Sequence, residues 1–233
     1  MKWFIAAALL SCLSTALAGD AKGPLKLVLV GDSTMCIWPT NGVQRGWGQF
    51  VQDYFDDGVR VINLAKSGRS TKTFISEGLW QQALAEKPDI VFIQFGHNDS
   101  HTPDHPEATD AGTDYQTNLC RYIDDARAAG ATPILITPMV RRTFGADGQL
   151  EDPLQRYADA MKRVGAEKNV PVIDLHASSK ALVESLGLKE SMKMANKEGD
   201  YTHFNAAGAR AMAALVMKEL PSVEPALKSH LKS

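Results

Sequence analysis

The stretch 89–99, DIVFIQFGHND, joins an apolar run at Asp89–Phe95 to a polar turn at Gly96-His97-Asn98-Asp99. The apolar residues do not alternate with polar ones, which is typical of a strand that is buried on both faces. Strands of this kind occur in parallel sheets that helices cover on both sides. This segment therefore predicts a parallel sheet with a polar turn at the end of one strand.

Further apolar runs and helical patterns alternate on either side of this segment. The strand candidates are Leu25–Val30, Val59–Leu64, Thr132–Thr137 and Val170–Leu175. The helix candidates are Thr71–Glu86, Asp114–Ala129, Asp152–Lys168 and Ala206–Leu220, with Gly130 after the second and Asn205 as an N-cap of the last. Five strands with helices between them predict one three-layer α/β domain. The polar stretch Ser100–Thr113 is expected to be a surface loop, and Lys189–Asp200 a second loop or a partly helical segment.

The composition fits a single globular domain. The 233 residues are 44% hydrophobic and 22% charged, and the formal net charge is −2. These values exclude collagen-like, disordered and polytopic membrane proteins. Because the charge is small and the sequence pI is near 6.3, no basic surface field for nucleic acid is expected. The sequence leaves the oligomeric state open.

The first 18 residues have the pattern of a secretory signal peptide. Lys2 is followed by an apolar run that starts at Trp3, and Ala16-Leu17-Ala18 forms a small-residue cleavage site. A membrane anchor is the alternative, but the run is short for a bilayer and polar residues interrupt it. We therefore expect a signal peptide at 1–18, a single domain at 19–233, export to the periplasm or the exterior, and no membrane contact after cleavage.

The cysteines and histidines predict no metal site. Cys36 and Cys120 would remain after cleavage, and either a disulfide between them or two separate thiols fits the sequence. No Cys/His cluster has the spacing of a zinc site. His101 and His105 lie in a polar loop, and we expect them to be solvated.

Residues of suitable chemistry follow three of the predicted strands. Ser33 follows the first strand, Gly68 the second and Asn98 the third. In open parallel sheets, the carboxyl ends of the strands form the crevice that binds ligands. Any one of these turns alone would be an ordinary turn. Together they predict a functional site at this edge of the sheet.

A serine hydroxyl needs a base to become a nucleophile, and that base needs an acceptor that orients it. His203 is the candidate base, and Asp200, three residues earlier, can reach its Nδ1 within one tight turn. The Nε2 atom would then face Ser33. A surface turn with a capping aspartate is the alternative interpretation of Asp200 and His203. His97 is a rival base that could instead support the loop or contact substrate.

Acyl transfer also needs donors that face the developing oxyanion. The backbone N–H groups of Ser33 and Gly68 and the side-chain amide of Asn98 are the candidates. Glycine at position 68 allows close approach and backbone conformations that a side chain would hinder.

Four sequence blocks, in order, resemble those of the SGNH (GDSL-type) hydrolases. They are GDSTM at 31–35, SGRS at 67–70, GHND at 96–99 and DYTHF at 200–204. With NLAKSGRSTKTF, TPMVRRTF and DYTHFNAAGA, the chain is more narrowly similar to the rhamnogalacturonan acetylesterases of carbohydrate esterase family 12. The resemblance extends from Leu27 to about Leu220.

This resemblance implies a flavodoxin-like α/β/α sandwich and a serine esterase that uses no metal or other cofactor. It assigns Ser33 as nucleophile, His203 as base and Asp200 as its orienting carboxylate. It assigns the oxyanion hole to Ser33, Gly68 and Asn98. The implied substrates are acetyl esters of pectic or related sugars.

Several charged and aromatic residues are candidates for substrate binding. Arg141 and Arg142 follow the fourth strand and could hold the carboxylates of galacturonic acid, or they could be structural. Arg69 adds positive charge nearby, and His97 could contact substrate. Trp38, five residues after Ser33, could stack on a sugar, whereas Trp47 and Trp80 are more typical of the core.

The resulting prediction is a serine esterase that releases acetate from an acetylated polysaccharide, foremost rhamnogalacturonan or related pectin. A deacetylase of xylan or of small acetylated sugars is an alternative. A lipase, thioesterase or lysophospholipase on the same fold is another, although the loops at the crevice are polar and charged. A carbohydrate-binding protein without catalysis is the alternative outside enzymes, and the presence of Ser33, Asp200 and His203 argues against it.

Overall fold

A computed structural model describes residues 23–232, so the predicted signal peptide at 1–18 lies outside the described residues. The strands are β1 (Leu25–Gly31), β2 (Val59–Asn63), β3 (Ile90–Gln94), β4 (Thr132–Ile136) and β5 (Val172–Ile173). They form one sheet in the order β2-β1-β3-β4-β5, and every neighbouring pair is parallel. This confirms the predicted five-stranded parallel sheet, in the flavodoxin-like order.

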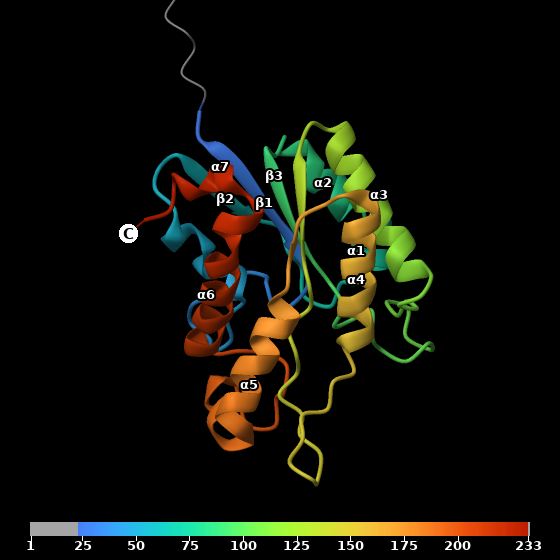
Figure 1. Cartoon of the computed structure of the whole chain (residues 1–233), viewed down its shortest axis with the longest axis vertical. Coiled ribbons are helices and arrows are strands. Elements are labelled where there is room, and N and C mark those ends of the chain that lie inside the picture. The colour runs from blue at the N-terminus through green and yellow to red at the C-terminus, as the bar shows by residue number, and fades with distance from the viewer. Residues whose placement is uncertain (1–22, 233) are drawn as a thin grey trace, which may run out of the picture.

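Helices cover both faces of the sheet, as Figure 1 shows. One face carries α1 (Thr71–Ser76), α2 (Leu79–Ala85), α3 (Asp114–Ala128) and α4 (Gln155–Lys168). The other carries the 3-10 helices η1 (Trp47–Tyr54) and η2 (Met192–Met194), with α5 (Leu175–Ser191), α6 (Ala206–Val223) and α7 (Pro225–Lys228). The predicted three-layer architecture is therefore confirmed.

The two hydrophobic cores explain why the strands lack alternation. Leu27 and Leu29 of β1 pack in the core under η1, α5 and α6. Val28 and Val30 of the same strand pack in the core under α1 to α4. Because each face of the strand meets a helical layer, both sets of side chains must be apolar.

Local signals set the helix boundaries. Asn205 caps α6 by accepting a hydrogen bond from the Gly208 N–H at 3.0 Å, as predicted. The helix expected at Thr71–Glu86 is instead two helices, because Gly78 adopts a left-handed conformation with φ of 75° between α1 and α2. The strand expected at Val170–Leu175 is shorter, because Asp174 caps a helix that begins at Leu175.

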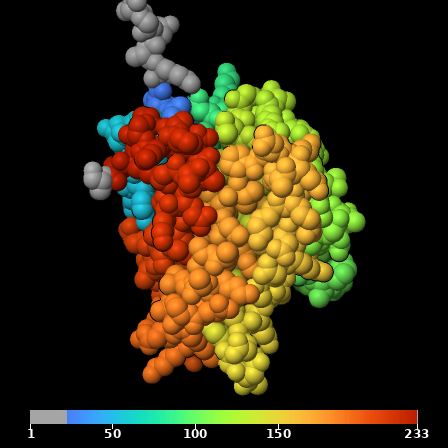
Figure 2. Space-filling view, viewed as in Figure 1, coloured from blue at the N-terminus to red at the C-terminus, as the bar shows by residue number. Residues whose placement is uncertain are grey.

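The carboxyl ends of the strands lie at the lower edge in Figure 1. In the space-filling view, the segment after β4 (yellow) and the α5–η2 segment (orange) project together below this edge (Figure 2). Within residues 23–232, no helix is both long and apolar enough to cross a membrane.

Candidate active site

The candidate residues lie where the connections from neighbouring strands diverge. The register of β1 and β3 pairs Gly31 with Gln94, so these two strands end at the same level. The chain then leads from β1 to β2 on one side and from β3 to β4 on the other. In open parallel sheets, ligands bind in the crevice at such a switch point. Ser33 and Asn98 follow these two strands.

A buried carboxylate organises the turn that carries Ser33. Oδ1 of Asp32 accepts hydrogen bonds from the backbone N–H and the hydroxyl of Thr34, at 2.9 and 2.7 Å. Burial raises the pKa of Asp32, but the nearby His97 and the hydrogen bonds from Thr34 lower this pKa further, to below its ordinary value of 3.8. Asp32 therefore stays ionised at neutral pH and holds the turn.

Ser33, His203 and Asp200 form a continuous hydrogen-bonded relay. Oγ of Ser33 lies 2.9 Å from Nε2 of His203, across 170 residues of sequence. Nδ1 of His203 lies 2.9 Å from Oδ2 of Asp200. The structure thus brings together the three residues that the sequence selected. A proton acceptor faces the serine hydroxyl, and a carboxylate orients that acceptor.

The same short turn keeps Asp200 ionised. Its Oδ1 accepts backbone N–H groups from His203 and Thr202, at 2.8 and 2.9 Å. Burial raises the pKa of Asp200, but these hydrogen bonds and the contact with the His203 ring lower this pKa below its ordinary value. The carboxylate is therefore charged at neutral pH and can stabilise an imidazolium on His203.

Arg142 holds the turn that carries Asp200 and His203. Its side chain is fully buried and stacks on the Phe204 ring, 4.6 Å from the centroid. Nη2 donates to the backbone carbonyls of Asp200 and His203, at 2.9 and 2.7 Å. Burial lowers the pKa of Arg142 to about 10, so the guanidinium remains charged at neutral pH. Because Arg142 is buried, the structural interpretation of this residue fits, and the interpretation that it contacts substrate does not.

Arg141 points the other way and lines a crevice of about 480 Å³ together with His203. Its guanidinium donates to the hydroxyl of Thr202 and, at 3.1 Å, to the backbone carbonyl of His97. Arg141 is therefore fixed beside the relay and presents a positive charge to the crevice.

The three predicted oxyanion donors keep N–H hydrogens that can bind a ligand. Within residues 23–232, the backbone N–H groups of Ser33 and Gly68 donate to no protein acceptor. Asn98 donates one amide hydrogen to the carbonyl of Arg69, at 2.9 Å, which fixes its side chain. The second amide hydrogen of Asn98 has no acceptor among the described residues. Gly68 has φ of 78°, a conformation that L side chains rarely adopt.

Trp38 forms one wall of the site. Its indole N–H donates to the backbone carbonyl of Ser33 at 2.9 Å, and its ring meets the ring of His203 edge-on at 6.3 Å. Trp47 and Trp80 are fully buried, so the core interpretation is right for both.

His97 does not contact Ser33 as a base would. It is buried, and its Nδ1 lies 3.3 Å from Oδ2 of Asp32. Burial lowers the pKa of His97 more than Asp32 raises it, so the ring is neutral at pH 7. The arrangement fits the support of the loop that the sequence allowed.

The remaining sequence candidates have structural partners. Arg69 forms an ion pair with Glu77 at 2.9 Å and also donates to the carbonyl of Ser67. Cys36 and Cys120 are free thiols that pack on opposite faces of the sheet, so the alternative of two separate thiols is right.

Sequence reasoning missed the roles of Asp32 and Arg142 in holding the turns that carry Ser33 and His203. Asp32 had a signal, because an aspartate two residues before a threonine commonly caps a turn. The orientation of Arg142 had none, because Arg141 and Arg142 are adjacent and only the fold decides which of them points inward.

Comparison with known proteins agrees with this geometry. Residues 29–211 match the GDSL-like Lipase/Acylhydrolase family. The chain is 39% identical over 228 residues to rhamnogalacturonan acetylesterase RhgT of Bacillus subtilis (strain 168), covering 91% of this chain and 96% of that protein.

Two solved structures share the fold. One is protein YXIM of Bacillus subtilis, with a TM-score of 0.75 and 30% identity over 85% of this chain, which spans only 56% of that protein. The other is Axe2, an acetylxylan esterase from Geobacillus stearothermophilus, with a TM-score of 0.66 and 23% identity over 85% of this chain and 95% of that protein.

These matches confirm the resemblance found in the sequence and support a carboxylic ester hydrolase. The chain belongs to the GDSL-like lipase/acylhydrolase, or SGNH hydrolase, family.

Proposed function

We propose that this protein is a serine esterase that removes acetyl groups from an acetylated pectic polysaccharide of the rhamnogalacturonan type. The observation that carries the proposal is the relay from Ser33 through His203 to Asp200, with both contacts at 2.9 Å. It lies at the switch point of the sheet, and N–H hydrogens of Ser33, Gly68 and Asn98 that have no acceptor within residues 23–232 can bind an oxyanion.

The first half of the reaction forms an acetyl-enzyme. Oγ of Ser33 attacks the acetyl carbonyl carbon while Nε2 of His203 takes the hydroxyl proton. The carbonyl oxygen becomes an oxyanion that the N–H groups of Ser33, Gly68 and Asn98 stabilise. The intermediate then collapses, the bond to the sugar oxygen breaks, and His203 gives its proton to that oxygen.

The second half releases acetate. Water attacks the acetyl-Ser33 carbonyl while His203 takes a proton from the water. The second tetrahedral intermediate collapses, acetate leaves, and His203 returns the proton to Oγ of Ser33. Throughout, Asp200 holds the Nδ1–H tautomer of His203 and stabilises its charged form.

The proposed substrate class rests on the relative more than on the crevice. The relative RhgT is named a rhamnogalacturonan acetylesterase and is similar over 91% of this chain. The crevice beside His203 is lined by Arg141 and Lys197, which can pair with an acidic sugar, and also by Glu198 and Asp200, so its charge alone does not select an acidic chain. A more distant relative, 26% identical, is named an acetylxylan esterase, so xylan is the competing glycan.

Acetate release from a panel of acetylated polysaccharides tests the substrate. We expect the highest kcat/KM on acetylated rhamnogalacturonan, a lower value on acetylxylan, and a sharp loss from acetyl to octanoyl in nitrophenyl esters. A preference for octanoyl esters would instead support the lipase-type alternative. Faster hydrolysis of acetylxylan than of rhamnogalacturonan would overturn the pectic assignment alone.

We further propose that the protein is exported after cleavage behind Ala18, because residues 1–18 have the order of a signal peptide. N-terminal sequencing of protein from the native host should begin at Gly19. A mature protein that begins at Met1 and stays in the cytoplasm would contradict this proposal.

A further inference from the structure

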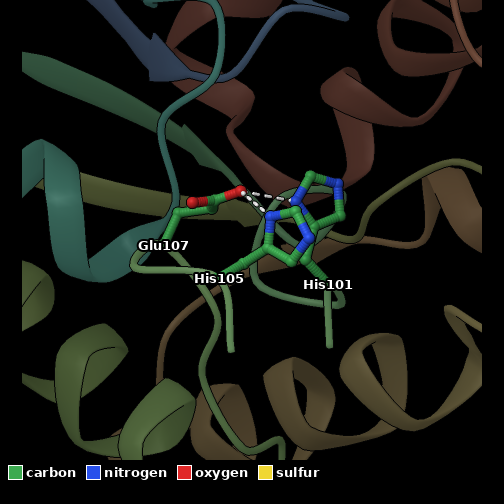
Figure 3. Close-up of side chains that lie close together, drawn as sticks. All are labelled: His101, His105 and Glu107. Atoms are coloured by element: carbon green, nitrogen blue, oxygen red, sulfur yellow. Dashed lines mark hydrogen bonds and ion pairs between the residues drawn. The ribbon is translucent and has the colours of Figure 1, made fainter. Parts of the chain in front are cut away.

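The polar loop after β3 carries a second cluster of ionisable side chains that ester hydrolysis does not use. The rings of His101 and His105 approach one oxygen of the Glu107 carboxylate from the same side, as Figure 3 shows. Nδ1 of His101 lies 2.6 Å, and Nδ1 of His105 lies 3.3 Å, from the same oxygen, Oε1 of Glu107. Both histidines are partly exposed, as expected, and both also pair with Glu107.

We propose that His101, His105 and Glu107 form a binding site for a divalent transition-metal ion of the Zn²⁺ type. Each residue offers one ligand atom, and the three atoms lie within 4.8 Å of one another. Imidazole nitrogen and carboxylate oxygen are the ligands that Zn²⁺ takes in proteins. Three protein ligands leave a fourth position for water, whereas Ca²⁺ and Mg²⁺ prefer sites built from oxygen.

The two distances to Glu107 fit an ion after a small adjustment, and the two imidazoles, whose ligand atoms lie within 4.8 Å, would approach each other. Ligands at about 2.0–2.1 Å from a tetrahedral Zn²⁺ lie roughly 3.3 Å from one another. The separation of 3.3 Å between Nδ1 of His105 and Oε1 of Glu107 already has this value. The 2.6 Å contact of His101 with Glu107 would open by roughly 0.7 Å. An ion would replace the shared proton of that hydrogen bond.

The loop holds these side chains near one another before an ion arrives. The His105 N–H donates to the carbonyl of Thr102 at 2.9 Å, and Pro103 and Pro106 restrict the backbone between the ligands. The His101 and His105 side chains are 36% and 52% exposed, so an ion can reach them from solvent. Ordering three exposed side chains costs entropy, and a preformed cluster has lost part of it already.

The charges around the cluster permit a cation. Glu107 supplies a carboxylate oxygen to the cluster. The hollow next to His101 is lined by Lys72 and Arg156 but also by Asp110 and Asp114. These two acidic residues offset the two basic ones.

A bound ion would act on structure rather than on the ester. The His101 N–H donates to the carbonyl of Asn98 at 3.2 Å, so the cluster is joined to the turn that carries an oxyanion donor. Binding to the folded state alone raises the melting temperature in proportion to the logarithm of the ion concentration. This inference does not rest on the proposed esterase function.

Isothermal titration calorimetry of chelator-treated, tag-free protein with ZnCl₂ tests the proposal. We expect one Zn²⁺ per chain, no comparable heat from CaCl₂, and at least tenfold weaker Zn²⁺ binding in both His105→Ala and Glu107→Gln. Cobalt(II) should give the visible absorption of a low-coordinate site in the parent protein and lose it in both variants.

His230→Ala is the matched control, because His230 is also partly exposed and paired with a carboxylate, that of Asp56 at 3.1 Å. This variant should bind Zn²⁺ as the parent does, and apo melting curves should show that all variants fold. Absence of Zn²⁺ binding, or equal Zn²⁺ affinity in the parent, His105→Ala and Glu107→Gln, would refute the site. Acetate release measured in parallel reports on the esterase independently.

Discussion

Replacing Arg142 by methionine should slow the chemical step while leaving substrate binding nearly unchanged. Arg142 is fully buried, and its guanidinium donates to the backbone carbonyls of Asp200 and His203. It is therefore a positioning residue for the turn that carries the base. Without the Arg142 guanidinium, the turn that positions the His203 imidazole loses two hydrogen bonds. A displacement of a catalytic group by about 1 Å typically lowers the rate about 100-fold.

The loss of stability should be similar in size to the loss of transition-state stabilisation, but small enough for the fold to survive. Two hydrogen bonds from a charged donor contribute roughly 3–6 kcal/mol together, and the stacking on Phe204 adds about 1–2 kcal/mol. Against this, Nε and Nη1 of Arg142 are buried without a partner among the described residues, and removing them returns roughly 1–3 kcal/mol each. The net loss is about 2 kcal/mol, which a domain of this size tolerates.

Steady-state kinetics on nitrophenyl acetate, with thermal melting of the same samples, measures both effects. We expect kcat of Arg142→Met to fall about 100-fold with KM within about threefold, and Arg142→Lys to lie between it and the parent, because lysine keeps the charge without the planar fork. Arg210→Met is the control, since Arg210 also stacks on a ring and pairs with an acid but lies exposed on α6. Parental kcat in a folded Arg142→Met variant would refute the positioning role.

Three further substitutions test other parts of the account. Asn98→Ala should lower kcat by about 100- to 1,000-fold on nitrophenyl acetate, since it removes one oxyanion donor, and an unchanged kcat would remove Asn98 from the hole. Asp200→Asn should lower kcat by about 1,000- to 10,000-fold between pH 6 and 8, where the lowered pKa of Asp200 keeps it ionised, and a loss under tenfold would contradict its orienting role. Asp99→Asn tests the dependence of stability on pH. Burial raises the pKa of Asp99 from 3.8 to about 7 in the folded protein. Between pH 4 and 7 the folded parent therefore binds a proton that the unfolded chain has lost, and the parent loses stability as the pH rises. Urea denaturation of the parent and of Asp99→Asn at several pH values measures this effect. The free energy of unfolding of the parent, minus that of the variant, should fall by up to about 4 kcal/mol from pH 4 to 7. A difference that stays constant over this range would contradict the prediction.

The sequence predicted the sheet because its signal was local. Each buried strand is a short apolar run that ends in a polar turn, and DIVFIQF before Gly96 is the clearest case. Asn205 and Gly130 likewise mark helix boundaries through their own chemistry. The helices α5 and η1 were not predicted. Helix α5 contains Gly187 in a non-helical conformation, and it packs against residues that are distant in the sequence.

The sequence also selected the members of the relay but not their support. Ser33, Asp200 and His203 carry recognisable chemistry, and the Asp-x-x-His spacing allows one tight turn. Which of two adjacent arginines turns inward depends on the position of Phe204 and of the turn, and both are set by tertiary packing. The cluster of His101, His105 and Glu107 was missed for a similar reason, because only a folded loop shows that three polar side chains converge on one oxygen.

The central claim is that Ser33 is the nucleophile and that His203 activates it. Peptide-level mass spectrometry after reaction with a fluorophosphonate, which adds to activated serines, tests this most directly. We expect a single adduct on Ser33 in the parent protein, none in Ser33→Ala, and labelling slowed by at least about 100-fold in His203→Ala. An adduct on another residue, or equal labelling of Ser33 without His203, would contradict it.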